Sequence, residues 1–162
     1  MEHLKKSIVG TRSGAAIAVY EGGSGVPVFA IGGMSATSFS ASGAASILER
    51  VARKGAARCV LMDLAAYGQS TAAGPGLTMD LWLQDIEEVF MARVGEPALW
   101  TGSSIGAWLM VLVHARRPEW FQAMCALAPA FDWDQQYAAP ALRDGRVKAT
   151  AKIGRASCRE RV

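Results

Sequence analysis

The chain has 162 residues, is 51% hydrophobic and carries a formal net charge of +3. This apolar content is enough to bury a single core, which excludes a disordered tail or a fibrous repeat. No apolar run reaches the roughly 18 to 20 residues that cross a bilayer, and no signal-peptide core follows the first lysines. We therefore expect one globular domain, or part of one, without an integral membrane segment and with a cytoplasmic location.

The positive charge is concentrated at the C-terminus. Residues 152–162 hold four basic residues against one acidic residue, which leaves 13 basic and 13 acidic residues in the rest of the chain. A neutral remainder without a basic stripe offers nothing to phosphate backbones, so we expect no nucleic-acid partner. Cys59, Cys125 and Cys158 lack metal-ligand spacing, and the first two lie in apolar runs, which predicts buried structural thiols. Neither a metal site nor a disulfide is expected.

The last segment, KIGRASCRERV (152–162), differs from everything before it. It has no apolar period and places an isolated cysteine among arginines. Read as codons, it resembles a translated sequencing-library adaptor; a natural basic tail is the alternative. Segments of this kind are left out of fold reasoning. We expect residues 1–151 to be the N-terminal part of a single domain that continues in the parent protein, and 152–162 to be a non-native tail.

The first half of the chain predicts two strands, a helix and a third strand. Residues 15–20 and 26–31 are short apolar segments that each end at glycines, which is typical of strands. Residues 42–54 place apolar side chains at helical spacing, with basic residues near the end and Gly55 as a plausible C-cap. Residues 58–64 (RCVLMDL) form an apolar run that predicts a buried strand.

The second half continues this alternation. A helix is expected to begin at Thr78, whose hydroxyl can cap it. Strands at 97–101 and 123–128 flank an apolar helix at 105–115. Strands that alternate with helices predict a parallel sheet with crossover helices, and continuous apolar strands fit a sheet covered on both faces. The predicted fold class is α/β, a three-layer α/β/α arrangement with a mainly parallel sheet.

A G-x-S-x-G sequence, residues 102–106, joins a predicted strand to a predicted helix. In that context Ser104 is forced into a strained backbone that exposes its hydroxyl, and the helix N-terminus offers N–H groups and partial positive charge to an oxyanion. The strand at 26–31 ends in Gly-Gly-Met, where such folds place the second oxyanion donor. We expect Ser104 to be the nucleophile and the backbone N–H groups of Met34 and Ile105 to form the oxyanion hole. A simple glycine turn is the alternative for residues 32–33.

Five short motifs follow one another along the chain: IGG at 31–33, DLAAYGQS at 63–70, GSSIG at 102–106, RPE at 117–119 and AP at 128–129. Their order and spacing resemble the α/β-hydrolase superfamily over about residues 15–135. The string GSSIGAWLM is similar to the abhydrolase branch described as palmitoyl-protein thioesterases and acyl-glucuronide esterases. Two positions depart from the family pattern: Ala66 replaces the first glycine of its D-x-x-G-x-G-x-S-like turn, and Ile31 replaces the usual histidine before the oxyanion glycines.

A serine hydroxyl needs a histidine base and an acid that orients it. The chain has only His3, before the first predicted strand, and His114, within the helix that leads away from Ser104, where a packing or surface role is favoured. The resemblance implies the order serine, acid, histidine, so both partners should lie downstream. Asp132 follows the strand at 123–128, where some members carry the acid; more carry it one strand later, and a solvated loop is the alternative.

The sequence thus predicts a serine hydrolase that cleaves carboxylic esters or thioesters of a small molecule or an acyl-protein, with no metal or organic cofactor. The fragment itself is expected to be inactive. Acyl transfer by the same fold, or a non-catalytic binding protein that keeps the turn, are the alternatives. An aromatic cluster is expected in the core and at the start of a cap, with a substrate wall as the alternative: Trp120, Phe121, Phe131, Trp133 and Tyr137. Substrate identity and oligomeric state do not follow from the sequence.

Overall fold

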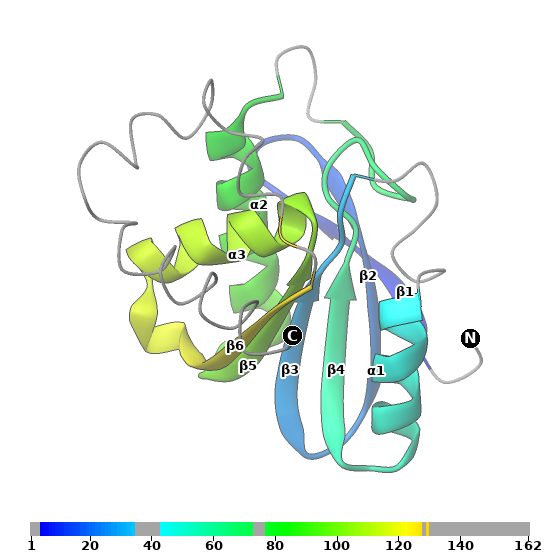
Figure 1. Ribbon diagram of the computed structural model, residues 1–162. Helices are drawn as coiled ribbons and strands as arrows, with labels where there is room; N and C mark the ends of the chain where they lie inside the picture. The colour runs from blue at the N-terminus through cyan, green and yellow to red at the C-terminus, as the bar shows by residue number, and fades with distance from the viewer. Residues whose placement is uncertain (1–3, 35–42, 73–76, 128, 130–162) are drawn as a thin grey trace.

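The computed structural model describes residues 4–34, 43–72, 77–127 and 129. They form one sheet in the order β1-β2-β4-β3-β5-β6, with helices on both faces (Figure 1). The strands are β1 (Lys5–Gly10), β2 (Ala16–Gly23), β3 (Val26–Ile31), β4 (Ala57–Met62), β5 (Ala98–Ser103) and β6 (Phe121–Leu127). The helices are α1 (Gly43–Arg53), α2 (Met79–Arg93) and α3 (Ile105–Arg116), followed by the 3-10 turn η2 (Pro118–Trp120). The predicted α/β class with a mainly parallel sheet is confirmed.

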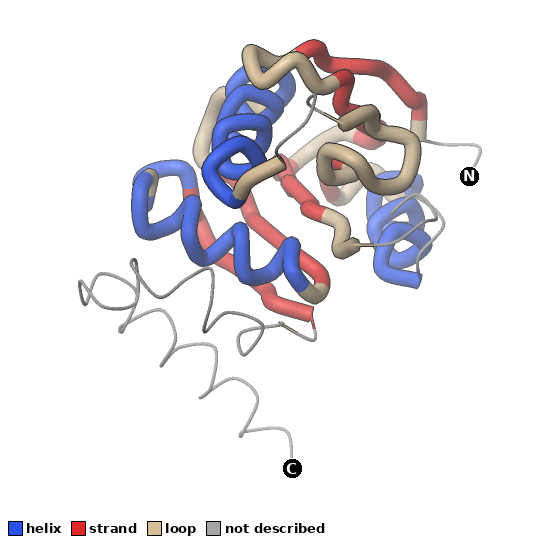
Figure 2. The backbone as a smooth tube through the Cα atoms, turned by 90° about the horizontal axis from the view of Figure 1, so that it is seen from above, coloured by secondary structure: helices blue, strands red, loops and turns tan. Residues whose placement is uncertain are grey.

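The order of the elements determines which helix covers which face of the sheet. β3, β4, β5 and β6 run parallel to one another, whereas β2 pairs antiparallel with both β1 and β4. Parallel strands need crossover connections, and here α1 links β3 to β4, α2 links β4 to β5, and α3 links β5 to β6. The helix α1 packs over β2 and β4 on one face, and Figure 2 shows α2 and α3 together on the other side of the strands.

The strand β1 is not predicted from the sequence. Its residues KKSIVG contain two lysines, and each residue is either exposed or half-buried. The strand forms because β2 offers it a full antiparallel partner, in a register that sets Ile8 opposite Ala18. Pairing between strands is a long-range contact, so a local pattern does not reveal it.

An aromatic cluster fills the core between the sheet and α2. Phe29 of β3 contacts Phe90 of α2 and Trp100 of β5 edge-on, with ring centroids 5.4 and 4.7 Å apart. Trp120 stacks on Phe90 at 4.7 Å, and Phe121 stacks on Trp100 at 4.3 Å. These rings hold α2 and the β5–β6 pair in a fixed relation. The core role predicted for Trp120 and Phe121 is confirmed; Phe131, Trp133 and Tyr137 lie outside the described residues.

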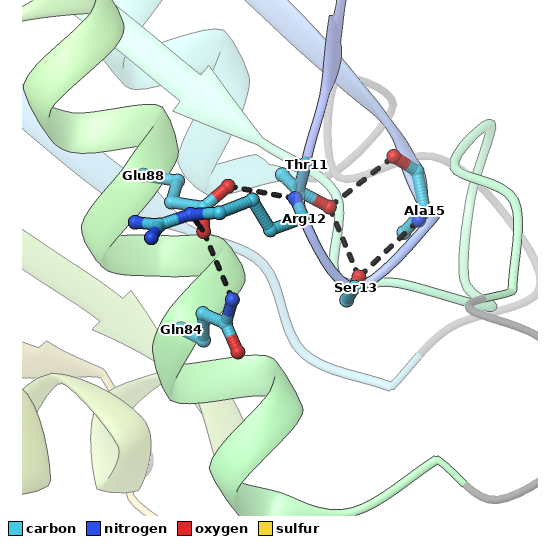
Figure 3. A network of polar contacts seen from close by, with 6 residues as sticks. All are labelled: Thr11, Arg12, Ser13, Ala15, Gln84 and Glu88. Atoms are coloured by element: carbon cyan, nitrogen blue, oxygen red, sulfur yellow. Dashed lines mark hydrogen bonds and ion pairs between the residues drawn. The ribbon is translucent and has the colours of Figure 1, made fainter.

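Polar contacts fix α2 to the hairpin that joins β1 and β2. The backbone N–H and the side chain of Arg12 donate to the two carboxylate oxygens of Glu88, at 2.9 and 2.8 Å, and Gln84 donates to Glu88 at 3.0 Å (Figure 3). Burial acts to raise the pKa of Glu88, but the Arg12 backbone N–H, the Gln84 amide and the Arg12 guanidinium outweigh it and hold that pKa below its ordinary value. At its N-terminus α2 is capped as predicted, because the Thr78 hydroxyl accepts the Leu81 N–H at 3.3 Å.

The two cysteines that the structure describes differ in exposure. Cys59 of β4 is fully buried beneath α1, and burial raises the pKa of its thiol to about 11, as suits a structural thiol. Cys125 of β6 is exposed, so the prediction of a buried thiol there is wrong. The prediction assumed a sheet covered on both faces, whereas α1 packs over β2 and β4 and leaves the same face of β6 open among the described residues.

Candidate active site

Ser104 is the single residue between β5 and α3. Its backbone has φ 54° and ψ −122°, a combination that non-glycine residues adopt only under strain. The turn is held from both sides: the Ser104 N–H donates to the Leu127 carbonyl of β6 at 3.0 Å, and its own carbonyl accepts the Ala107 N–H at 3.1 Å. The residue is exposed and its hydroxyl makes no capping bond to α3. The predicted strand–turn–helix arrangement is therefore present, with its serine presented to solvent.

Two glycines allow the turn after β3 to lie directly against this strained residue. A Cβ on Gly106 would lie 2.3 Å from the Gly32 carbonyl oxygen, closer than any side chain tolerates. A Cβ on Gly33 would lie 3.2 Å from the Ser104 Cβ. The first turn of α3 and the end of β3 are thus in backbone contact, and the Gly-Gly-Met segment passes beside Ser104.

The two predicted oxyanion donors lie on two segments next to the serine. Ile105 is the first residue of α3, where N–H groups lack helical acceptors and the helix dipole is positive. Its side chain is buried in the core. Met34 directly follows Gly33 and packs, partly buried, against the core. The two predicted oxyanion donors therefore belong to the two segments that meet at Ser104.

The loop after β4 is rigidly held beside this turn. The Met62 carbonyl accepts the Gly32 N–H at 3.1 Å, which joins the end of β4 to the glycine segment. The next residue, Asp63, is buried, and its carboxylate accepts the Tyr20 hydroxyl at 3.2 Å and the Gln69 N–H at 3.0 Å. Ala66, at the position where the family pattern has glycine, adopts a left-handed backbone with φ 70°. The sequence does not predict the contact between Tyr20 and Asp63, because the two residues lie 43 positions apart along the chain and no local pattern links them.

The described residues do not bring a base to Ser104. His114 lies nine residues along α3 from Ile105, about 14 Å at 1.5 Å per residue. Its ring meets Phe121 edge-on at 4.9 Å, which fits the packing role predicted for it. His3 and the candidate acid Asp132 lie outside the described residues. The described residues therefore form the turn around Ser104, but they do not contain a triad.

Metal and membrane sites are equally absent from what is described. Within residues 4–34, 43–72, 77–127 and 129, no three His, Cys, Asp or Glu side chains gather to hold a metal ion. None of the helices in these ranges combines the length and the apolar character needed to cross a membrane.

Sequence comparison finds partial, distant relatives. No family model matches the chain. A stretch of 74 residues, 46% of this chain, is 30% identical to the mitochondrial palmitoyl-protein thioesterase ABHD10 of Homo sapiens, and equally to that of Pongo abelii. The match covers 24% of the length of each of these relatives.

Structural comparison identifies the fold. The model superposes on alpha/beta hydrolase domain-containing protein 10 from mouse with a TM-score of 0.69 and 22% identity, over 79% of this chain and 51% of that one. It superposes equally well, at 0.69 and 20% identity, on the thioesterase domain from the curacin biosynthetic pathway, over 78% of this chain and 46% of that one. The chain thus spans about half the length of these structures. It has the α/β-hydrolase fold, and part of it is distantly similar in sequence to palmitoyl-protein thioesterases.

Proposed function

We propose that this chain carries the nucleophile of a serine hydrolase whose parent protein cleaves carboxylic esters or thioesters through an acyl-enzyme on Ser104. The observation that carries this proposal is the backbone of Ser104, with φ 54° at the N-terminus of α3. Strain of about 1–3 kcal/mol persists where the surrounding structure enforces it, and here it accompanies an exposed serine at a helix N-terminus. The substrate class is supported by the similar proteins, which are described as thioesterases.

The chemistry follows from the positions of these groups. The Ser104 oxygen attacks the substrate carbonyl carbon while its proton passes to a histidine base. The carbonyl oxygen becomes an oxyanion and is held by the Met34 and Ile105 amides. Its collapse expels the alcohol or thiol, which takes the proton from the histidine. Water, activated by the same base, then attacks the acyl-enzyme and releases the acid and the free serine.

The proposed mechanism also needs a histidine base for Ser104 and an acid that orients this histidine. The 162 residues hold only His3 and His114, and the second lies about 14 Å along α3 from the turn. We assign the base to polypeptide of the parent protein outside this chain. Asp132 is a candidate for the acid, with a residue after the next strand as the alternative.

The test compares the 162-residue chain with the full parent protein. The parent is expected to hydrolyse short p-nitrophenyl esters or thioesters and to react with a fluorophosphonate probe, and Ser104→Ala should abolish both. Ser103→Ala is the matched control one residue away and should keep most of the activity, because residue 103 still belongs to β5. The short chain should show no turnover, since loss of triad members costs about 10⁴- to 10⁶-fold in rate.

Two outcomes would refute the proposal in different ways. Enzymatic turnover by the isolated 162 residues, or an active Ser104→Ala parent, would show that the nucleophile is elsewhere. A parent that neither turns over nor labels at Ser104 would favour the non-catalytic binding protein. Formation of a new ester when an alcohol is added would identify acyl transfer as the second step.

A further inference from the structure

We draw no further inference here: the strongest candidate, the buried carboxylate of Asp85 on the core-facing side of α2, has no hydrogen-bond partner among the residues that the structure describes, and nothing in the structure shows which group or ligand would meet it.

Discussion

Replacing the strained serine with glycine should stabilise the fold while removing the proposed nucleophile. Ser104 has φ 54° and ψ −122°, a region in which glycine meets no Cβ penalty. The hydroxyl makes no capping bond to α3, so its removal alone should change the stability little. Ser104→Ala keeps the Cβ and the strain, and is therefore the matched control for Ser104→Gly.

The magnitude follows from two opposing terms. Relief of the strain is worth about 1–3 kcal/mol, and the added conformational freedom of glycine in the unfolded chain costs about 0.5–1 kcal/mol. The difference between these terms centres on about 1.3 kcal/mol, so the free energy of unfolding of Ser104→Gly should exceed that of Ser104→Ala by about this amount. With a urea m-value of about 2 kcal/mol/M, the unfolding midpoint should rise by roughly 0.6 M.

Urea titration followed by tryptophan fluorescence measures this difference, because Trp100 and Trp108 are each 1% exposed and report on the core. All three proteins are compared at one concentration, so that any association affects them equally. Equal midpoints for the glycine and alanine variants, or a lower midpoint for glycine, would refute the strained turn and remove the main support for the proposed nucleophile.

The remaining predictions concern a close backbone contact beside this turn, a left-handed residue after β4 and the charge of Glu88 on α2. Gly106→Ala forces a Cβ to 2.3 Å from a backbone oxygen at the end of β3 and should cost about 2–4 kcal/mol in urea titration, whereas Gly10→Ala, with nothing within 4 Å, should be nearly neutral. Ala66→Gly should raise the free energy of unfolding by about 0.5–1 kcal/mol, because it releases the strain of a left-handed residue with φ 70°. The pKa of Glu88 is lowered in the folded state, so the ionised carboxylate stabilises the fold fully above the ordinary glutamate pKa. This stabilisation is lost as the pH falls through the folded pKa. The difference in free energy of unfolding between wild type and Glu88→Gln should therefore be constant near neutral pH and shrink below about pH 4.5. A difference that does not change with pH would rule out this role for the Arg12 contact.

Much of the fold could be predicted because its signals are local. The apolar run at 26–31 became β3 with the expected bounds, and the helix expected at 105–115 extends one residue further. Thr78 caps α2 as its hydroxyl suggests. These signals depend only on a few neighbouring residues: an apolar run ends at glycines, or a threonine caps a helix. Such local preferences are retained in the folded structure when the packing of the core is compatible with them.

The features that could not be predicted depend on distant partners. β1 exists because β2 pairs with it, and Tyr20 reaches Asp63 across the sheet. The exposure of Cys125 depends on which helix covers β6, a property of the assembled layers that the local pattern of FQAMCAL does not contain. Apolar content predicts that a strand belongs to a sheet, but not that both of its faces are covered in a given chain.

The contacts described above for the turn at Ser104 all lie within the described part of the chain. Its N–H is held by the Leu127 carbonyl, and Gly33 and Gly106 bring the end of β3 and the first turn of α3 against it. These contacts meet at one edge because β3, β5 and β6 are parallel neighbours, so their carboxyl ends lie together. None of them requires the base or the acid. The proposed nucleophile can therefore be built before the rest of a triad is supplied, which is why we expect this chain to combine a formed turn with no turnover.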